Sequence, residues 1–105
     1  IPILGINLGR LGFLTDVSVD SMITVVGNIL DGEFIKEKRS LLSCQIEQNG
    51  KVLSKNLAFN EVVIHRNLAP RMIEFELHVD DDFVNNQRAD GLIVTTPTGS
   101  TACII

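Results

Sequence analysis

The stretch 89–102, ADGLIVTTPTGSTA, decides more about this chain than any other part of it. Its apolar run 92–94 predicts a short buried strand, and the Asp90-Gly91 pair before it is typical of a turn. Pro97 lacks a backbone N–H and therefore ends the strand. Residues 98–101 then combine glycine with small hydroxyls, so their N–H groups and side chains suit an oxygen-rich ligand such as ribose or phosphate. An ordinary strand, turn and helix fits the same letters, and both interpretations stay open.

The front of the chain follows the pattern of a strand, a glycine turn and a helix. Residues 3–6 form a short apolar run, and glycines at positions 5, 9 and 12 mark the turn after it. Apolar residues between 19 and 30 recur every three or four positions, as on one face of an amphipathic helix. We expect Asp16 or Ser18 to cap the start of this helix and Gly32 to end it. Strand, turn and helix make half of an α/β unit.

The remaining two-thirds of the chain predicts extended strands joined by tight turns. Asn49-Gly50 is the strongest hairpin signal, because a two-residue turn favours positive φ at both positions. Residues 73–79 alternate strictly between apolar and polar, which indicates one buried and one solvated face. Asp80-Asp81-Asp82 is interpreted as a turn, and Thr98 or Ser100 is placed to cap a helix at the end. The predicted strands cover residues 41–46, 51–57, 59–64, 73–79, 83–88 and 92–94.

These patterns give an α+β fold class. The end of an α/β domain is expected at residues 1–34, followed by a mainly antiparallel β domain at 35–105. With 105 residues, 45% of them hydrophobic, the chain is long enough for one modest core. It begins without methionine inside a strand-like run and stops where a helix is expected to start, so we interpret it as an internal segment of a larger protein.

Composition argues against several classes of function. The net charge of −4, with acids and bases interspersed, disfavours non-specific nucleic-acid binding, which needs a basic face. No apolar run approaches the roughly 18 residues that span a bilayer, and no signal peptide is visible. Cys44 and Cys103 lack the spacing of a zinc site or a disulfide framework, which indicates reduced thiols in a cytoplasmic protein.

Two common nucleotide motifs are absent. The glycines near the front are not spaced as G-x-G-x-x-G, and residues 97–101 lack the lysine of a phosphate-binding P-loop. Asn60-Glu61 is the clearest polar interruption of an apolar run. The pair either contacts the hydroxyls or base edge of a ligand, or one of the two merely faces water. Arg88 and Asp90, two positions apart, share a face and pair if their strand continues.

Five motifs, in order, resemble those of the bacterial NAD kinase family, which transfers a phosphoryl group from ATP to the adenosine ribose 2′-hydroxyl of NAD to give NADP. They are NLGRLGFLT at 7–15, NEVV at 60–63, RMIEF at 71–75, RADG at 88–91 and TPTGSTA at 96–102. Each motif alone is weak, but five at compatible spacings over essentially the whole chain are specific. The resemblance implies an N-terminal α/β domain, a β-rich C-terminal domain and NAD in the cleft between them.

The same resemblance implies which residues bind the adenosine half of NAD. Asn60 and Glu61 would contact adenosine. Three residues of the last motif, Thr98, Thr101 and Ala102, would line the adenine pocket. Amide and carboxylate groups suit hydroxyls and base edges, which agrees with the interpretation of these residues on their own.

Five further positions are carried over to the NAD site. Arg71, Arg88 and Asp90 would complete it, with the Asp90 turn reaching toward the nicotinamide end of a ligand on a neighbouring subunit. Phe13 would form part of the wall near the domain junction. Cys103 stands where the family has a tyrosine, so an aromatic or hydroxyl contact is missing at that position.

The resemblance also implies what lies outside this chain. The family's catalytic aspartate, in a G-G-D-G loop, would precede residue 1, so no catalytic or metal-binding residue is assigned here, and we expect the chain alone not to turn over. Mg²⁺ or another divalent metal would accompany ATP. A cytoplasmic homodimer or homotetramer is implied, with NAD and ATP as partners and neither nucleic acid nor membrane. The alternatives are a lipid or sphingoid-base kinase of related fold and a non-catalytic dinucleotide-binding module.

Overall fold

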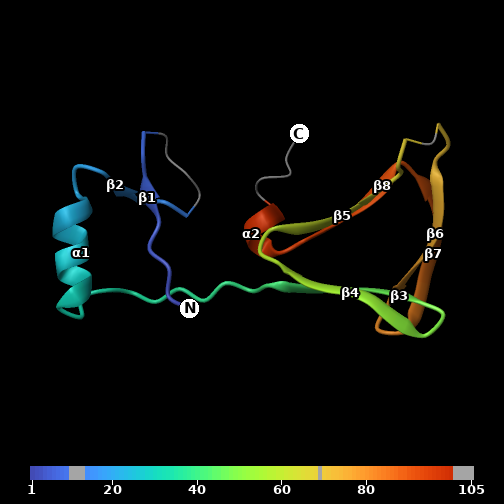
Figure 1. Ribbon diagram of the computed structural model, residues 1–105, viewed down its shortest axis with the longest axis horizontal. Coiled ribbons are helices and arrows are strands. Elements are labelled where there is room, and N and C mark those ends of the chain that lie inside the picture. Colours follow the sequence, from blue (N-terminus) through green and yellow to red (C-terminus); the bar gives the residue numbers. More distant parts are fainter. Residues whose placement is uncertain (10–13, 69, 101–105) are drawn as a thin grey trace. The chain divides into compact units, whose positions relative to one another are not determined.

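The computed structural model describes residues 1–9, 14–68 and 70–100, and the chain divides into two compact units, Ile1–Glu37 and Lys38–Ile105 (Figure 1). Each unit is described by itself. The assignment of residues 1–34 and 35–105 to the two domains of a kinase stays a prediction. Among the described residues, no helix has the length and apolarity needed to cross a membrane.

The described residues of the first unit form a parallel strand pair and a helix. Strand β1 (Ile6–Asn7) pairs with β2 (Val17–Ser18), and helix α1 (Met22–Leu30) follows. The strand predicted at 3–6 therefore starts later than expected.

The predicted cap of α1 is wrong. The N-cap is Ser21, which makes no hydrogen bond from its side chain to the first turn. Ser18 lies before that position, where its hydroxyl accepts a bond from the Ser21 N–H at 3.3 Å. The predicted end is confirmed, since Gly32, which follows the C-cap residue Asp31, has a φ of +89°.

The second unit is built from antiparallel ribbons. Strands β3 (Leu42–Gln48) and β4 (Lys51–Ala58) form a hairpin, as do β6 (Ile73–Val79) and β7 (Asp82–Ala89). Asn49 and Gly50 have φ values of +51° and +71°, which confirms the predicted two-residue turn. The expectation of a mainly antiparallel fold with few helices is confirmed.

A third ribbon joins two strands that are far apart in the sequence. Strand β5 (Glu61–His65) pairs antiparallel with β8 (Gly91–Thr95), and the short helix α2 (Pro97–Ser100) follows β8. The pairing encloses the whole β6–β7 hairpin between its two strands. Figure 1 shows α2 beside the corner at which β4 passes into β5. We call this pair of strands the β5–β8 ribbon.

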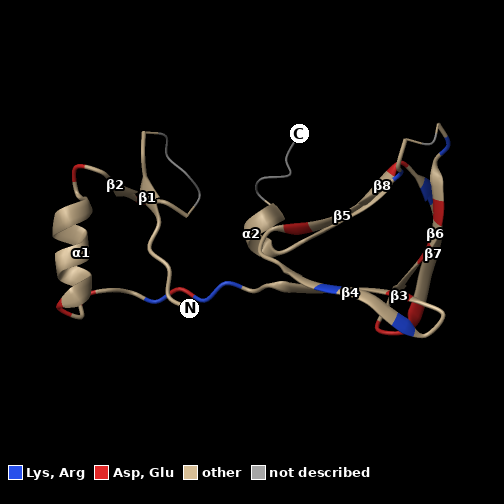
Figure 2. Ribbon diagram, in the orientation of Figure 1, with Lys and Arg blue, Asp and Glu red and all other residues tan. Residues whose placement is uncertain are grey.

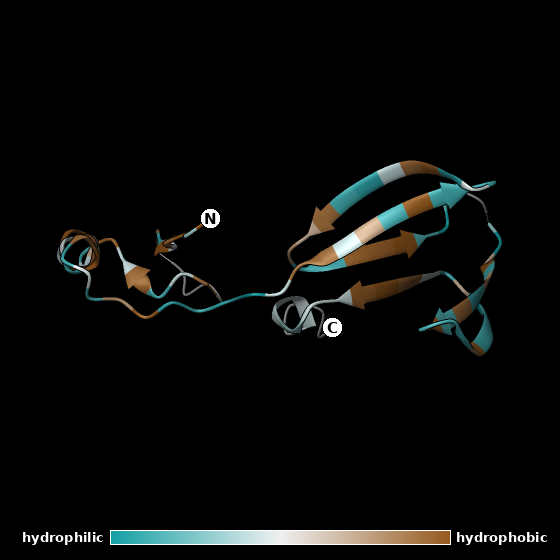
Figure 3. Cartoon of the chain, turned by 90° about the horizontal axis from the view of Figure 1, so that it is seen from below, coloured by the Kyte–Doolittle hydropathy of each residue, from teal (hydrophilic) through white to brown (hydrophobic). Residues whose placement is uncertain are grey.

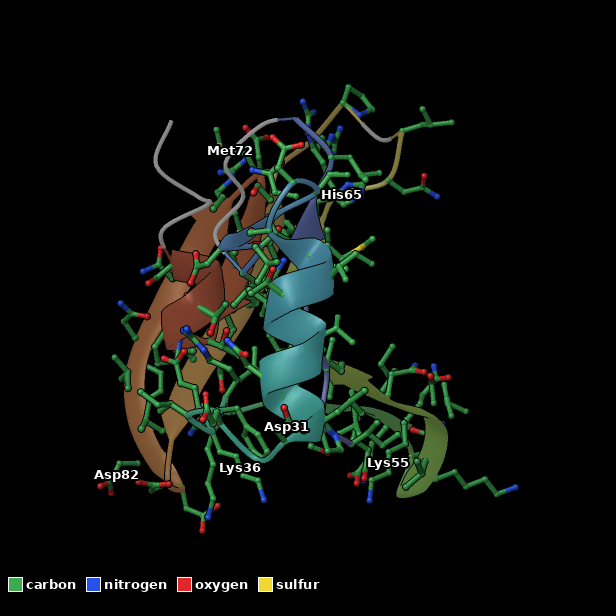
Figure 4. All side chains as sticks on the ribbon, turned by 90° about the vertical axis from the view of Figure 1, so that its left-hand side faces the viewer. Asp31, Lys36, Lys55, His65, Met72 and Asp82 are labelled. Carbon is green, nitrogen blue, oxygen red and sulfur yellow. The ribbon has the colours of Figure 1, made fainter. Side chains whose placement is uncertain are left out.

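The expectation of a modest core is wrong for the part of the chain that the structure describes, where no hydrophobic residue is buried. The reason is architectural, because within the described residues each sheet has two strands, and a two-stranded ribbon has too little area to bury a hydrophobic face. Apolar and polar residues alternate along several strands (Figure 3), and charges of both signs are interspersed (Figure 2). Lys55 on β4 and Asp82 at the start of β7 are exposed and project outward (Figure 4).

Candidate functional site

A group of hydrogen bonds around Thr96 joins the corner between β4 and β5 to the loop after β8. The backbone N–H of Thr96 donates to the Asn60 carbonyl at 2.8 Å. The Thr96 hydroxyl lies 2.8 Å from the Phe59 carbonyl and 3.2 Å from the Asn60 carbonyl. We call the group Phe59, Asn60, Thr96, Thr98 and Gly99 the hydroxyl corner. It brings together two segments whose contact residues, Phe59 and Thr96, are 37 positions apart.

Thr96 also caps α2, which corrects the prediction that Thr98 or Ser100 does so. Its Oγ1 accepts the N–H of Gly99 at 3.1 Å, and its carbonyl accepts the N–H of Ser100 at 3.0 Å. The helix begins one turn earlier than expected, at Pro97, where the missing N–H does no harm. The predicted availability of the Gly99 and Ser100 N–H groups to a ligand is therefore wrong, because Thr96 already binds both.

Gly99 packs against the backbone of the opposite segment. A Cβ built at Gly99 would lie 2.2 Å from the Asn60 carbonyl oxygen and 2.6 Å from its carbon. Real side chains do not tolerate such distances, and the obstacle is backbone rather than a movable side chain. Glycine is therefore required at this position for the loop to touch the strand corner.

Two predicted ligand residues share this corner. Asn60 is exposed and precedes the first residue of β5, while Glu61 is half-buried and lies opposite Thr95 in the ribbon. Thr98 is only 7% exposed. Its hydroxyl accepts a hydrogen bond from Arg39 Nη1 at 3.4 Å. Asn60 and Thr98 thus lie on the two segments that the backbone bond between Thr96 and Asn60 joins.

The predicted charged residues lie elsewhere, at the other end of the β5–β8 ribbon. Arg66 follows β5 and pairs with Asp90, its Nε 3.1 Å from the carboxylate and its N–H 2.9 Å from the Asp90 carbonyl. Arg88 on β7 lies 3.7 Å from Glu74 on β6. Arg71 is exposed in the bend before β6. We call Arg66, Asp90, Arg88, Glu74 and Arg71 the charged end.

The predicted pairing of Arg88 with Asp90 is wrong. Strand β7 ends at Ala89, so Asp90 sits in the turn and does not share a strand face with Arg88. Each of the two instead has a partner on a different strand or loop. A shallow hollow opens beside Asp90, lined by His65, Arg66, Asn67, Leu68, Pro70 and Asp90.

The predicted NAD-site residues thus fall into two groups. Asn60, Glu61 and Thr98 lie at the hydroxyl corner, whereas Arg71, Arg88 and Asp90 lie at the charged end. Each strand of the ribbon has five residues, which at about 3.3 Å per residue separates the groups by roughly 16 Å. The other four predicted positions, Phe13, Thr101, Ala102 and Cys103, lie outside the described residues.

Within residues 1–9, 14–68 and 70–100, no cluster of three or more histidine, cysteine, aspartate or glutamate side chains is placed to hold a metal ion. Cys44 is a free thiol of intermediate exposure.

Several residues that make contacts at these two places were not predicted as site residues, among them Arg39, Phe59, Arg66, Glu74, Thr96 and Gly99. A signal for Thr96 exists, since a threonine directly before a proline is a frequent start of a helix. Arg39 lies in a charged stretch before β3, and nothing in the neighbouring sequence indicates its contact with Thr98.

The comparisons with known proteins agree on one family. Residues 59–105 match the family model of the ATP-NAD kinase C-terminal domain. The chain is 56% identical over 102 residues to an NAD kinase of Hydrogenovibrio crunogenus, covering 97% of this chain and 35% of that protein. It is 50% identical over 102 residues to an NAD kinase of Nitrosomonas eutropha, covering 97% of this chain and 34% of that one.

A solved structure shows the same similarity in three dimensions. A yeast NADH kinase complexed with NADH has a TM-score of 0.81 to this chain at 28% sequence identity. The match covers 90% of this chain and 28% of the yeast chain. This chain thus spans about a third of the length of the curated relatives that it matches. The motif-based resemblance is confirmed.

Proposed function

We propose that this chain, which is 56% identical to an NAD kinase over 97% of its length, forms the part of such a kinase that holds NAD. The reaction is transfer of the terminal phosphoryl group of ATP to the 2′-hydroxyl of the adenosine ribose, giving NADP. The single observation that carries the proposal is the hydroxyl corner, where Asn60 and the Thr96–Gly99 loop are hydrogen-bonded to each other.

The hydroxyl corner supplies groups that suit an adenine nucleoside. The Asn60 amide donates and accepts hydrogen bonds, as an adenine edge or a ribose hydroxyl requires. Glu61 offers carboxylate oxygens to hydroxyl donors, and Thr98 offers a hydroxyl close by. Thr101 and Ala102, the next two residues in the sequence, are assigned to the adenine pocket, and Cys103 stands in place of the family's tyrosine.

The charged end suits the rest of the dinucleotide. Arg71 and Arg88 carry guanidinium groups, which bind phosphate oxygens through several donors in a fixed geometry. Asp90 accepts hydrogen bonds from the nicotinamide ribose of a ligand, including one on a neighbouring subunit of a homodimer or homotetramer. The roughly 16 Å between the two groups calls for an extended ligand with polar chemistry at both ends.

Catalysis itself is assigned outside these residues. The first unit is assigned to the end of an α/β domain, Phe13 to the NAD site by resemblance to the family, and the catalytic aspartate to a loop of that domain. Mg²⁺ is assigned to the phosphates of ATP, where it neutralises their charge, and no residue of this chain is given a metal-binding role. The cytoplasm is the proposed compartment, in keeping with the free thiol of Cys44.

The test is a graft into a complete relative, because none of the described hydrophobic residues of this chain is buried by the chain itself. The chain replaces its 102 matching residues in the Hydrogenovibrio crunogenus NAD kinase. We expect NADP to form from NAD and ATP with a kcat/KM within about tenfold of the parent enzyme. Asn60→Ala in the graft should raise the KM for NAD, while Asn28→Ala on α1 serves as the matched control.

Three outcomes would count against the proposal. A folded graft that binds NAD and forms no NADP favours a non-catalytic dinucleotide module. A graft that phosphorylates diacylglycerol and leaves NAD unchanged favours a lipid kinase. An active graft whose KM for NAD does not respond to Asn60→Ala removes this corner from the binding site. Fold and solubility are checked by thermal unfolding alongside the parent enzyme.

A further inference from the structure

We infer that Thr96 is a positioning residue for the dinucleotide site: its hydroxyl fixes the spacing between Asn60 and Thr98 without itself contacting the ligand. The inference rests on the proposed function, since it takes Asn60 and Thr98 as contacts of NAD. Thr96 is 2% exposed, which places its side chain behind the surface that a ligand reaches.

The Thr96 hydroxyl acts as a bridge because it is a donor and an acceptor at once. Its single proton is directed to the Phe59 carbonyl at 2.8 Å, with the Asn60 carbonyl at 3.2 Å as the second acceptor. Its lone pair accepts the Gly99 N–H at 3.1 Å. One oxygen therefore holds the strand corner on one side and the α2 loop on the other.

The hydrogen bonds of the Thr96 hydroxyl can be removed by mutation without removing the backbone bond between Thr96 and Asn60. The backbone N–H of Thr96 donates to the Asn60 carbonyl at 2.8 Å, and that bond survives any side-chain replacement. Removing only the hydroxyl therefore leaves the two segments in contact. It deprives the Phe59 carbonyl and the Gly99 N–H of their partner at a site too enclosed for water to take its place.

The spacing of the ligand residues depends on this bridge. Asn60 carries one of the carbonyls at the hydroxyl, and Thr98 directly precedes Gly99, whose N–H the hydroxyl binds. A loosened loop has to be ordered when the ligand binds, which lowers affinity. The transfer of the phosphoryl group relies on residues elsewhere, so its rate on bound substrate stays nearly unchanged. A raised KM at constant kcat is the expected signature.

The experiment uses three variants of the graft described above. Thr96→Val keeps the branched shape and removes the hydrogen bonds, and we expect the KM for NAD to rise about tenfold or more with kcat within about threefold. Thr96→Ser keeps the hydroxyl and should hold the KM within about threefold of the unsubstituted graft. Thr24→Val, at an exposed position of α1, is the matched control and should change neither constant. The KM for ATP is measured throughout and should stay constant.

Each alternative outcome has a definite meaning. A lower apparent kcat with an unchanged KM for NAD would show that Thr96→Val only reduces the folded fraction, and would overturn the inference. Equal KM values for the valine and serine variants would also overturn it, since the KM would then not depend on whether the hydroxyl is present. An inactive parent graft overturns the proposed function and takes this inference with it. An active parent with an unaffected valine variant overturns this inference alone.

Discussion

The two ends of the β5–β8 ribbon are held by different kinds of interaction. The hydroxyl corner is closed by backbone groups around Thr96, which is 2% exposed. At the charged end one backbone hydrogen bond, from the Arg66 N–H to the Asp90 carbonyl, is joined by ion pairs in solvent, and the side chains of Arg66 and Asp90 are 40% and 71% exposed. Buried hydrogen bonds are costly to leave unmade, whereas exposed ion pairs contribute little. The corner is therefore built as a rigid frame, and the charged end as a set of groups able to move onto a ligand.

The rigid character of the corner is tested most severely at Gly99. In Gly99→Ala the new Cβ would lie 2.2 Å from the Asn60 carbonyl oxygen, so the loop has to move away from the strand. We expect a loss of about 1–3 kcal/mol in the free energy of unfolding, together with a raised KM for NAD. Thermal and denaturant unfolding of the graft, with steady-state kinetics, measure the two effects.

The control for Gly99 is the same substitution in open surroundings. A Cβ at Gly27 in α1 meets nothing within 4 Å, so Gly27→Ala should stabilise the helix by about 0.5–1 kcal/mol. We therefore expect Gly99→Ala to lower the free energy of unfolding and Gly27→Ala to raise it. A tolerated Gly99→Ala with unchanged stability and KM would show that the corner is not tightly packed.

Features that depend on neighbouring residues could be predicted from the sequence. The strand predicted at 73–79 is β6 as observed, because a strict alternation lies within one element. The Asn49-Gly50 turn could be predicted for the same reason, because it depends on two adjacent residues. The Arg88–Asp90 pair was not predicted correctly, because the face of a residue depends on where its strand ends. Local patterns therefore predict strands and turns, but they do not predict which side chains pair where a strand ends.

The candidate site was predictable in composition but not in arrangement. The resemblance named Asn60 and Thr98, yet only the pairing of β5 with β8 brings them to one corner. When two paired strands are separated by a whole hairpin, neither strand's own sequence pattern indicates its partner. The contact of Arg39 with Thr98 spans 59 positions and is equally invisible in the sequence.

A smaller effect is expected at Arg39, which donates a hydrogen bond to Thr98 of the corner. Its bond to the Thr98 hydroxyl is long, at 3.4 Å, so it adds modestly to the frame that Thr96 provides. Arg39→Ala should raise the KM for NAD by about two- to fivefold, corresponding to the roughly 1 kcal/mol of an ordinary hydrogen bond. Arg39→Lys should recover part of this loss. Lys38→Ala, one position earlier, is the matched control, and an equal effect of the two alanine variants would assign the change to net charge.

The smallest effect on stability is expected at the charged end. A double-mutant cycle of Arg66→Gln and Asp90→Asn should give a coupling below about 1 kcal/mol, because both side chains are exposed and solvent screens the pair. The backbone bond from the Arg66 N–H to the Asp90 carbonyl is untouched by either change and keeps the ribbon closed. The Arg88–Glu74 pair, 68% and 75% exposed, is the matched cycle and should couple even less. Asp90→Asn should nevertheless raise the KM for NAD, since binding and not folding is the role proposed for that carboxylate. A coupling of several kcal/mol that persists in high salt would show the charged end to be as rigid as the hydroxyl corner, and the contrast between the two ends would no longer hold.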